Sequence, residues 1–424
     1  MFKALAAITA LLLATAALLT GNGLQGTLLA VRADLEGFDS SLIGVMMAAY
    51  FGGFIVGCRI NPVLIKSAGH IRAFVALASI ASASTLIHPL FVDWIAWSIL
   101  RGITGFCIAG MIMIIESWLN ERATNAERGR LLSVYRIVDL LATMVGNALI
   151  ATASPLGFEL FAITSIMISI ALVPVALTRT PAPQPIKTAK LDLGKIYRLS
   201  PAAAIVAPVI GLANGAFWAI GPVYAGRLGY PEAIIGAFMS TTILGAAILQ
   251  WPVGWISDKI DRRIVLALSA VGASLAAFGL SRYGTNSVFL LLSLGALYGA
   301  FAMSLTGLTA AHANDHAEPE TAVATSGSVL LLNGVGSILG SIAGGLVLSF
   351  FTAPAVFVYV SVMMAVVAML CFIRIIIQPP PGVDMKSPFT PLPRSASPAV
   401  FEIGEEQEED DLVEGDNATA ATTP

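Results

Sequence analysis

The residues best placed to do chemistry are ionisable side chains within otherwise apolar stretches of the chain. Arg136 and Asp139 are the clearest case, because a spacing of three residues places them on one face of a helix. A charge in an apolar stretch of membrane length is costly, and by default it faces a partner or a functional cavity. Burial favours the neutral form of a carboxylate, so Asp139 is suited to taking up and releasing a proton. We predict a proton-coupling role for this pair, with a static ion pair as the alternative.

Glu116 and Arg101 are two further ionisable residues in apolar stretches. With a rise of about 1.5 Å per residue, Glu116 and Arg136 lie roughly 5 and 8 Å from the same end of neighbouring stretches. This similar depth predicts a structural ion pair between Glu116 and Arg136. Arg101 lies roughly 10 Å below the opposite end. It is either a functional cation or a buried cation held by backbone carbonyl oxygens.

Histidines and cysteines predict no metal centre. His312 and His316 lie close in sequence to Asp315, a set that could bind a metal, but their place at the end of an apolar stretch favours a hydrated loop. The three cysteines lie singly in apolar stretches, which fits neither a disulfide framework nor a metal site. The sequence contains no Gly-x-x-x-x-Gly-Lys-Ser/Thr loop for a nucleotide. We therefore expect no catalytic residue, no metal, no cofactor and no direct use of ATP.

The composition indicates which elements must position these residues. Of 424 residues, 57% are hydrophobic and 12% are charged, whereas soluble domains carry roughly 25% charged residues. A soluble chain of this size could not bury so much apolar surface, which excludes a soluble enzyme, a nucleic-acid binder and a disordered protein. The composition predicts an all-α protein that crosses the lipid bilayer several times.

Twelve apolar stretches are long enough to cross about 30 Å of hydrocarbon as transmembrane helices. The first also resembles a secretory signal, but its apolar run to Val31 is too long for a cleaved signal. The twelve predicted spans lie near residues 4–31, 41–65, 71–90, 94–119, 130–153, 157–178, 201–226, 233–256, 263–282, 287–311, 322–350 and 353–377.

Two polar breaks divide the chain. Residues 179–200 contain three prolines and five basic residues, and we predict that they form a cytoplasmic linker between two six-helix halves, 1–178 and 201–377. Nine of the 26 acidic residues follow Val400, so the first 400 residues hold 17 acidic and 23 basic side chains. Residues 378–424 are predicted to be a disordered acidic cytoplasmic tail.

The positions of lysine and arginine predict the orientation, because cytoplasmic loops carry an excess of these residues. Seventeen of the 23 lie on the side that holds both termini and the linker, three lie on the opposite side, and three lie within or at the ends of spans. We therefore predict that both termini are cytoplasmic.

The two halves are related by an internal repeat at an offset of 192 residues. The alignment needs no gap across two helices and the loop between them, which indicates a duplication. Two homologous halves in one membrane suggest a transporter with its substrate site between them, near the midplane. The offset aligns Asn22-Gly23 with Asn214-Gly215, Gly37-Phe38 with Gly229-Tyr230, Ile43-Gly44 with Ile235-Gly236, and Gly53 with Gly245.

The loop after the eighth span resembles the signature loop of the major facilitator superfamily, in which Gly, three residues, Asp, a base, one residue, Gly and two bases follow one another. Asp261 stands where the family usually has Gly, and the first-half copy, with Pro62, Lys66 and His70, is degenerate. Arg101-Gly102 opens a run that resembles the family's second motif. The signature loop reads Gly254-Trp255-Ile256-Ser257-Asp258-Lys259-Ile260-Asp261-Arg262-Arg263.

The resemblance implies the major facilitator fold, with twelve helices in two homologous halves and a cavity lined by spans 1, 4, 7 and 10. It implies a proton-coupling role for Arg101. Asparagine amides in spans 1 and 7 are predicted to bind substrate, with hydrogen bonding between helices as the alternative. The predicted substrate-binding residues are Asn22, Gln25, Asn214 and Trp218, and the predicted cytoplasmic gate is Gly254, Asp258, Lys259, Arg262 and Arg263.

We therefore predict a secondary active transporter that moves a small solute by alternating access in a bacterial inner membrane. Proton coupling and export are favoured, and an importer or uniporter of the same fold is the alternative. A membrane receptor or scaffold that does not transport is the alternative from another class. The expected partners are a small-molecule substrate, the lipid bilayer and protons; nucleic acid is not a partner, and the protein is expected to be a monomer.

Overall fold

The fold is described from a computed structural model for residues 2–122, 125–177, 193–317 and 321–377. Within these residues all regular structure is helical, and twelve spans are long and apolar enough to cross a membrane. The prediction of an all-α protein with twelve membrane spans is confirmed.

The first six spans form the N-terminal half. Two short 3-10 segments, η1 (His88–Leu90) and η2 (Leu149–Thr152), extend α3 and α5. The helices are α1 (Phe2–Leu35), α2 (Ser40–Ala68), α3 (His70–Ile87), α4 (Trp94–Arg122), α5 (Asn125–Ala148) and α6 (Glu159–Ala176).

The last six spans form the C-terminal half, in which α11 and α12 together make one span. A short helix, α7 (Leu193–Leu199), precedes them. The other helices are α8 (Pro201–Arg227), α9 (Glu232–Lys259), α10 (Arg262–Tyr283), α11 (Val288–Ala302), α12 (Leu305–Asn314), α13 (Ala322–Phe350) and α14 (Pro354–Ile377).

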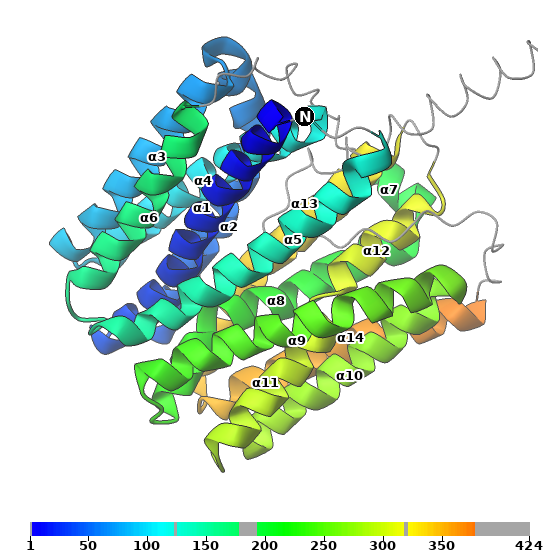
Figure 1. The fold of residues 1–424 in the computed structure, drawn as a ribbon. Helices are drawn as coiled ribbons and strands as arrows, with labels where there is room; N and C mark the ends of the chain where they lie inside the picture. Colours follow the sequence, from blue (N-terminus) through cyan, green and yellow to red (C-terminus); the bar gives the residue numbers. More distant parts are fainter. Residues whose placement is uncertain (1, 123–124, 178–192, 318–320, 378–424) are drawn as a thin grey trace, which may run out of the picture.

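The spans run alternately between two faces. We call the face at which α1 begins and α14 ends the terminal face, and the opposite face, which carries the α1–α2 and α8–α9 turns, the distal face (Figure 1). These two turns are built alike, because Gly37 and Gly229 have φ values of 79° and 84°. Only glycine adopts this left-handed region without strain. The shared turn geometry at an offset of 192 residues is what a duplicated half would produce.

The two halves meet along two pairs of helices. We call the packing of α2 against α13 the α2–α13 seam and the packing of α5 against α9 the α5–α9 seam. Each seam has a glycine near its distal end, where the helix backbones come very close. A Cβ atom at Gly44 would lie 2.5 Å from the carbonyl oxygen of Ser341, and one at Gly236 would lie 2.6 Å from that of Asn147. Gly44 and Gly236 are also 192 residues apart.

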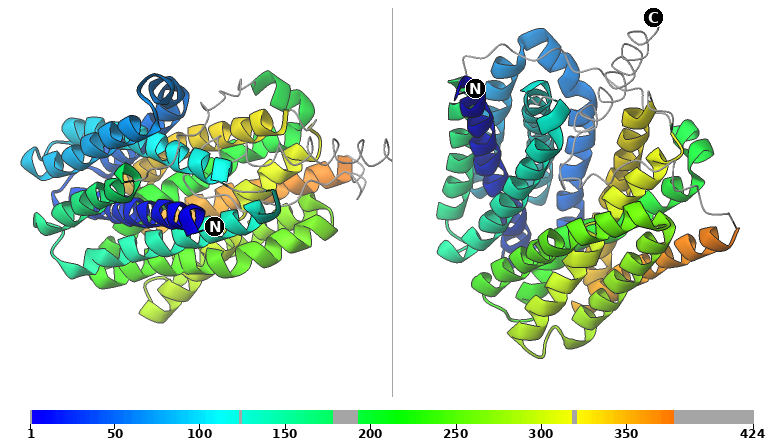
Figure 2. Two further views of the ribbon diagram at one scale, coloured as in Figure 1. Left: turned by 45° about the horizontal axis from the view of Figure 1, so that its top comes forward. Right: turned by 45° about the vertical axis from the view of Figure 1, so that its right-hand side comes forward.

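Polar contacts join the halves at the distal face. Arg227 at the end of α8 donates to Asp34 at 2.7 Å and to Ser40 at 2.8 Å. Ser349 on α13 donates to Asp39 before α2 at 3.2 Å. Toward the terminal face, the helices of the two halves diverge (Figures 1 and 2). The described conformation is therefore closed at the distal face.

The region between the halves contains a helix that the sequence analysis did not predict. Residues 178–192 lie outside the described residues, and α7 follows them. Ile196 of α7 is buried in a cluster with Ala203 of α8 and Ala310 of α12, which seats α7 on the C-terminal half. The predicted linker and tail boundaries stay predictions, and residues 378–424 also lie outside the described residues.

Candidate functional site

The centre of the candidate site is the Arg136–Asp139 pair on α5. Nη1 of Arg136 donates to Oδ2 of Asp139, and both side chains are more than nine-tenths buried. Nε and Nη2 of Arg136 donate to Oε1 of Gln250 on α9, at 3.3 and 3.1 Å. One guanidinium thus joins a carboxylate on its own helix to an amide in the other half. Gln250 was missed in the sequence because an amide in an apolar span carries no formal charge.

Glu116 on α4 has a different neighbour from the one predicted. It is fully buried and accepts a hydrogen bond from the Tyr135 hydroxyl at 3.3 Å. The predicted ion pair between Glu116 and Arg136 is not formed among the described contacts of Arg136. Asp139 lies one turn from Arg136 on the same helix and takes the guanidinium instead.

Arg101 lies in the packing between α4 and α2, apart from the α5–α9 seam. Its guanidinium carbon is 4.5 Å from the centre of the Tyr50 ring, and the residue is 2% exposed. A cation over an aromatic ring is stabilised by the negative face of the ring. The structure therefore divides the three residues predicted to couple protons between two places, Arg101 at α2–α4 and the pair at α5–α9.

Asn22 on α1 and Asn214 on α8 occupy equivalent places in the two halves. Each lies 13 residues before the last residue of its helix, about 20 Å from the distal end. Neither amide forms a hydrogen bond with another described residue, and Oδ1 of Asn214 is buried without a partner. Because an unsatisfied buried polar atom is costly, Oδ1 of Asn214 is expected to bond a group outside the described protein contacts.

Gln25 and Trp218 lie one turn from these asparagines, toward the distal face. Nε2 of Gln25 donates to Thr85 on α3 at 3.1 Å, while its Oε1 is buried without a partner. Trp218 is 7% exposed and lies edge-to-face with Phe217, with ring centres 5.1 Å apart. Gln25 is thus partly used in helix packing, and Trp218 is part of an aromatic cluster of the C-terminal half.

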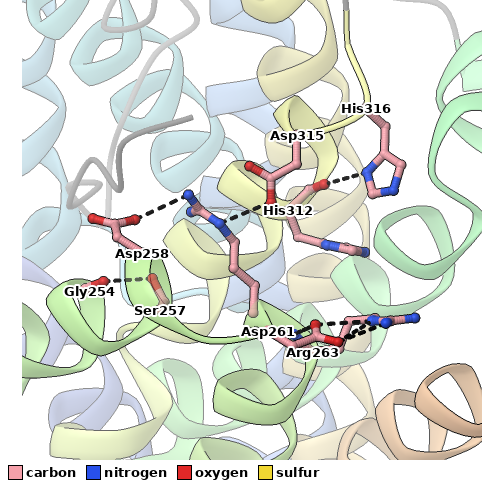
Figure 3. A network of polar contacts seen from close by, with 9 residues as sticks. Gly254, Ser257, Asp258, Asp261, Arg263, His312, Asp315 and His316 are labelled. Carbon is pink, nitrogen blue, oxygen red and sulfur yellow. Dashed lines mark hydrogen bonds and ion pairs between the residues drawn. The ribbon is translucent and has the colours of Figure 1, made fainter. Parts of the chain in front are cut away.

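Three of the predicted gate residues, Asp258, Arg262 and Arg263, belong to two ion-pair groups at the terminal face (Figure 3). In the first, Arg262 contacts Asp258 at 3.1 Å and Asp315 at 3.0 Å. The contact with Asp315 is an ion pair rather than an aligned hydrogen bond. Arg262 and Asp315 are almost fully buried, whereas the Asp258 side chain is 40% exposed. Arg262 therefore links α9, α10 and α12.

In the second group, Asp261 caps α10 and pairs with Arg263 at 2.7 Å. Burial raises the pKa of Asp261, but the hydrogen bonds and charge of Arg263 outweigh this and hold that pKa below its ordinary value. Arg263 also donates to the carbonyl oxygen of Arg374 on α14 at 3.2 Å. Asp261, which stands where the family usually has glycine, thus caps α10. In the first half the equivalent residue is Gly69, with φ of 84° and no side-chain cap.

The remaining gate residues make local contacts. The carbonyl oxygen of Gly254 accepts from the Ser257 hydroxyl at 2.7 Å (Figure 3). Nζ of Lys259 lies 3.6 Å from the centre of the Trp255 ring. These contacts hold the end of α9 and leave Asp258 directed at Arg262.

The prediction of a hydrated loop is wrong for His312 and Asp315. His312 is 4% exposed and Asp315 is 6% exposed, because α12 extends to Asn314 and packs against α8, α10 and α13. Asp315 is thus a buried partner of Arg262 that the sequence analysis did not assign to the gate. Within the part of the chain that the structure describes, no three His, Cys, Asp or Glu residues are grouped to hold a metal ion.

Twelve spans of membrane length among the described residues, in two related halves with polar groups between them, define a multi-pass membrane protein of the transporter class. Comparison with known families shows to which family the chain belongs. Residues 11–231 and 203–405 each match the model of the Major Facilitator Superfamily. The chain belongs to this superfamily, a family of transporters.

Two relatives of the chain carry the same description. The protein described as "Uncharacterized MFS-type transporter YcaD" in Escherichia coli is 25% identical over 361 residues, which cover 84% of this chain and 91% of the relative. The protein of that description in Escherichia fergusonii is 23% identical over 321 residues, which cover 75% and 83%.

Solved structures with similar folds are also transporters. The crystal structure of nucleoside transporter NupG is similar with a TM-score of 0.73 and 14% identity, covering 88% of this chain and 99% of that one. The crystal structure of a D-xylose-proton symporter is similar with a TM-score of 0.67 and 15% identity, covering 91% and 99%. At these identities the similarity shows the fold alone.

Proposed function

We propose that this protein is a secondary active transporter that moves a small polar solute across the membrane by alternating access. The observation that carries the proposal is the pair Asn22 and Asn214, whose amides lie at equal depth in the two halves and bond no described residue. A solute held by both amides would be held by both halves, so binding would depend on how the halves are placed. Trp218, one turn away, offers an aromatic ring for a flat or apolar part of the solute.

The orientation with cytoplasmic termini is part of the proposal. In that orientation the described conformation is closed toward the outside, because Gly44, Gly236 and the Arg227–Asp34 ion pair all lie toward the distal face. Transport requires the opposite state, in which these contacts separate and the terminal face closes. Arg262 is placed to stabilise that closure, since it already ties α9, α10 and α12 together at the terminal face.

We also propose that the coupling ion is a proton carried by Asp139 and that the direction is export. Asp139 is a buried carboxylate in a span, and Arg136 beside it stabilises its charged form. Uptake of a proton would neutralise Asp139 and leave Arg136 without its ion pair. The two charge states would therefore favour different arrangements of α5.

A solute screen followed by flux measurements tests the proposal. Purified protein is first screened by thermal shift against neutral and charged small solutes, and the solute that stabilises it is then tested in proteoliposomes. Asn22→Ser and Asn214→Ser should each weaken binding about tenfold, the effect of losing roughly one hydrogen bond to a polar solute. Asn333→Ser is the matched control, because Nδ2 of Asn333 already donates to the carbonyl oxygen of Ala207 at 3.3 Å. Equal losses in all three variants would remove the paired asparagines from the substrate site.

The proton is tested with Asp139→Asn. This variant should lose accumulation driven by a pH gradient and keep exchange of labelled solute, because exchange needs binding and rocking without net proton movement. Undiminished accumulation would show that the proton, if there is one, is carried elsewhere. Loss of both activities would indicate that Asp139 is a structural partner of Arg136.

A further inference from the structure

Gln250 is a buried amide of α9 that the proposed function leaves unexplained. It lies nine residues before Lys259, the end of α9, and thus about 14 Å from the terminal end of its helix. The residue is 4% exposed. Its Oε1 accepts both hydrogen bonds from Arg136, and its Nε2 is buried without a partner among the described residues.

The guanidinium of Arg136 is shared between the two halves in a fixed geometry. Nη1 is directed to Asp139, while Nε and Nη2 are directed to Gln250. Because a guanidinium is planar and rigid, its orientation toward the carboxylate also sets its orientation toward the amide. A change at Asp139 is therefore felt at Gln250, in the other half of the protein.

The free Nε2 of Gln250 indicates that this residue has a second set of contacts. A buried donor without an acceptor destabilises the conformation in which it occurs. A conformation in which Nε2 meets an acceptor is favoured by the same amount. Gln250 thus biases the equilibrium between conformations of the α5–α9 seam, and Arg136 decides how firmly it is held in the present one.

We infer that Gln250 is the positioning residue that transmits the protonation of Asp139, through Arg136, to the C-terminal half. The inference rests on the proposed role of Asp139 as the proton carrier. When Asp139 is charged, Arg136 is fixed and holds Gln250, and the seam keeps the described arrangement. When Asp139 is neutral, the ion pair is lost, Gln250 is released and the two halves are free to rock.

Other titratable groups near the pair, among the described residues, lie on α5 and α4. The charges of Asp139, Arg136 and Glu116 all act on the buried Tyr135, whose hydroxyl donates to Glu116. The described charged residues of α1 and α9 lie near the ends of these helices. Asp139→Asn leaves Tyr135 and Glu116 in place, so a pH response of the seam that this variant abolishes depends on Asp139.

The experiment measures a distance and needs no substrate. Cys58, Cys107 and Cys371 are replaced by Ser, and spin labels are placed at Ser67 on α2 and Ile376 on α14, both exposed at the terminal face. Distances between the labels are recorded for the full-length protein in liposomes at pH 5.5 and pH 8.5. The parent protein should change its distance distribution between the two pH values.

Gln250→Met keeps the length of the side chain and removes the amide, and it should reduce the pH-dependent shift at least threefold. Ser240→Ala is the matched control, because it removes a 2.9 Å hydrogen bond to Met144 across the same seam without touching Arg136. It should keep the full shift. If Gln250→Met does not fold, Gln250→Glu is measured instead; it would pair with Arg136 at both pH values and should also suppress the shift.

The outcomes separate the inference from the function on which it rests. A shift that survives in Gln250→Met or Gln250→Glu but is lost in Asp139→Asn overturns the role of Gln250 and leaves Asp139 as the proton carrier. A shift that survives in Asp139→Asn overturns the proposed proton carrier itself. Equal suppression by Gln250→Met and Ser240→Ala would show that any hydrogen bond across the seam is sufficient, which also overturns the inference.

Discussion

The α2–α13 and α5–α9 seams are equivalent in the repeat, yet they differ in chemistry. At their distal ends both rely on a glycine, Gly44 or Gly236, that lets two helix backbones come close. Further toward the terminal face the two seams have different side chains. The α5–α9 seam holds Gln250 and the buried Arg136–Asp139 pair, whereas position 58, the repeat equivalent of Gln250, is Cys58.

This contrast separates the features of the duplication that depend on the backbone from those that depend on side chains. Close helix contacts survive in both copies because they depend on the absence of a side chain, which any replacement of glycine destroys. The side chains of the two seams can differ, because only a seam with a functional role needs polar groups. The two seams therefore share their close glycine contacts, and the buried Arg136–Asp139 pair lies in the α5–α9 seam.

The largest expected effect comes from breaking the charged pair in the α5–α9 seam. Arg136→Gln removes the cation that contacts the buried Asp139, and it should lower the free energy of unfolding by about 3 kcal/mol. Adding Asp139→Asn should restore part of the loss, because the remaining carboxylate becomes a neutral amide. Thermal unfolding in detergent measures both.

The matched change in the other seam is Cys58→Ala, which removes no charge and should cost less than about 1 kcal/mol. A double variant that is less stable than Arg136→Gln alone would contradict this account of the pair. It would mean that the amide at position 139 cannot be accommodated, and that the seam is held by shape rather than by charge.

The next effect concerns the feature that the seams share. Gly44→Val and Gly236→Val each place a side chain where a carbonyl oxygen lies 2.5 or 2.6 Å from the Cβ position. Overpacking of this kind costs about 1–3 kcal/mol, and 1.4 kcal/mol changes an equilibrium about tenfold. Both variants should therefore open the distal face, seen as a longer distance between spin labels at Leu156 and Phe289.

Gly52→Val is the control for the glycines, because a Cβ atom at Gly52 on α2 meets nothing within 4 Å. It should leave the distance unchanged. If only one of the two seam variants opens the distal face, the seams are mechanically unequal as well as chemically unequal.

The sequence was sufficient for the features that repeat along the chain. Twelve spans follow from apolar runs of membrane length, and twelve are found among the described residues. The alignment of Gly37 with Gly229 indicated a duplication, and both residues have a left-handed backbone. These features are local, so each can be recognised within its own stretch of sequence.

The sequence was not sufficient for contacts between distant helices. Arg136 contacts Asp139 and Gln250 rather than the predicted Glu116. The depth of a residue along its own helix does not show which of these side chains faces the guanidinium. Asp315 was assigned to a hydrated loop because it follows an apolar stretch, but α12 and its neighbours bury it against Arg262. Helix rotation and tertiary packing decide both cases, and neither is encoded in a local pattern.

A smaller effect on stability is expected at the signature loop after α9, whose copy in the first half is degenerate. Asp258→Asn removes a partially exposed ion pair to Arg262, and such pairs contribute about 0–1 kcal/mol. The variant should fold and insert, yet lower transport, because Asp258 is proposed to support closure of the terminal face. Asp315→Asn removes the buried partner of Arg262 and should cost more stability than Asp258→Asn, but less than Arg136→Gln, because Arg262 keeps its ion pair with Asp258.

Expression level, unfolding temperature and flux of the two variants separate stability from gating. The first-half equivalent of Asp258 is Lys66, an exposed residue that lacks the carboxylate. Lys66→Asn should therefore leave transport unchanged. Normal transport by a well-expressed Asp258→Asn protein would remove the second-half loop from the gate as well.

The smallest effect is expected at Asp261, where the second half has a helix cap and the first half has Gly69. Asp261→Asn keeps a side chain that caps well but removes the charge that pairs with Arg263. Its cost at pH 7 should be about 0.3–1 kcal/mol.

The pKa of Asp261 is lowered in the folded protein, so the contribution of this carboxylate to stability is complete above the ordinary value of 3.8 and is lost as the pH falls below that value. The unfolding temperatures of Asp261→Asn and the parent should differ at pH 7, and the difference should shrink as the pH falls below 3.8. A difference that does not shrink as the pH falls would show that Asp261 acts through the shape of its cap, and that the two halves differ here in packing rather than in charge.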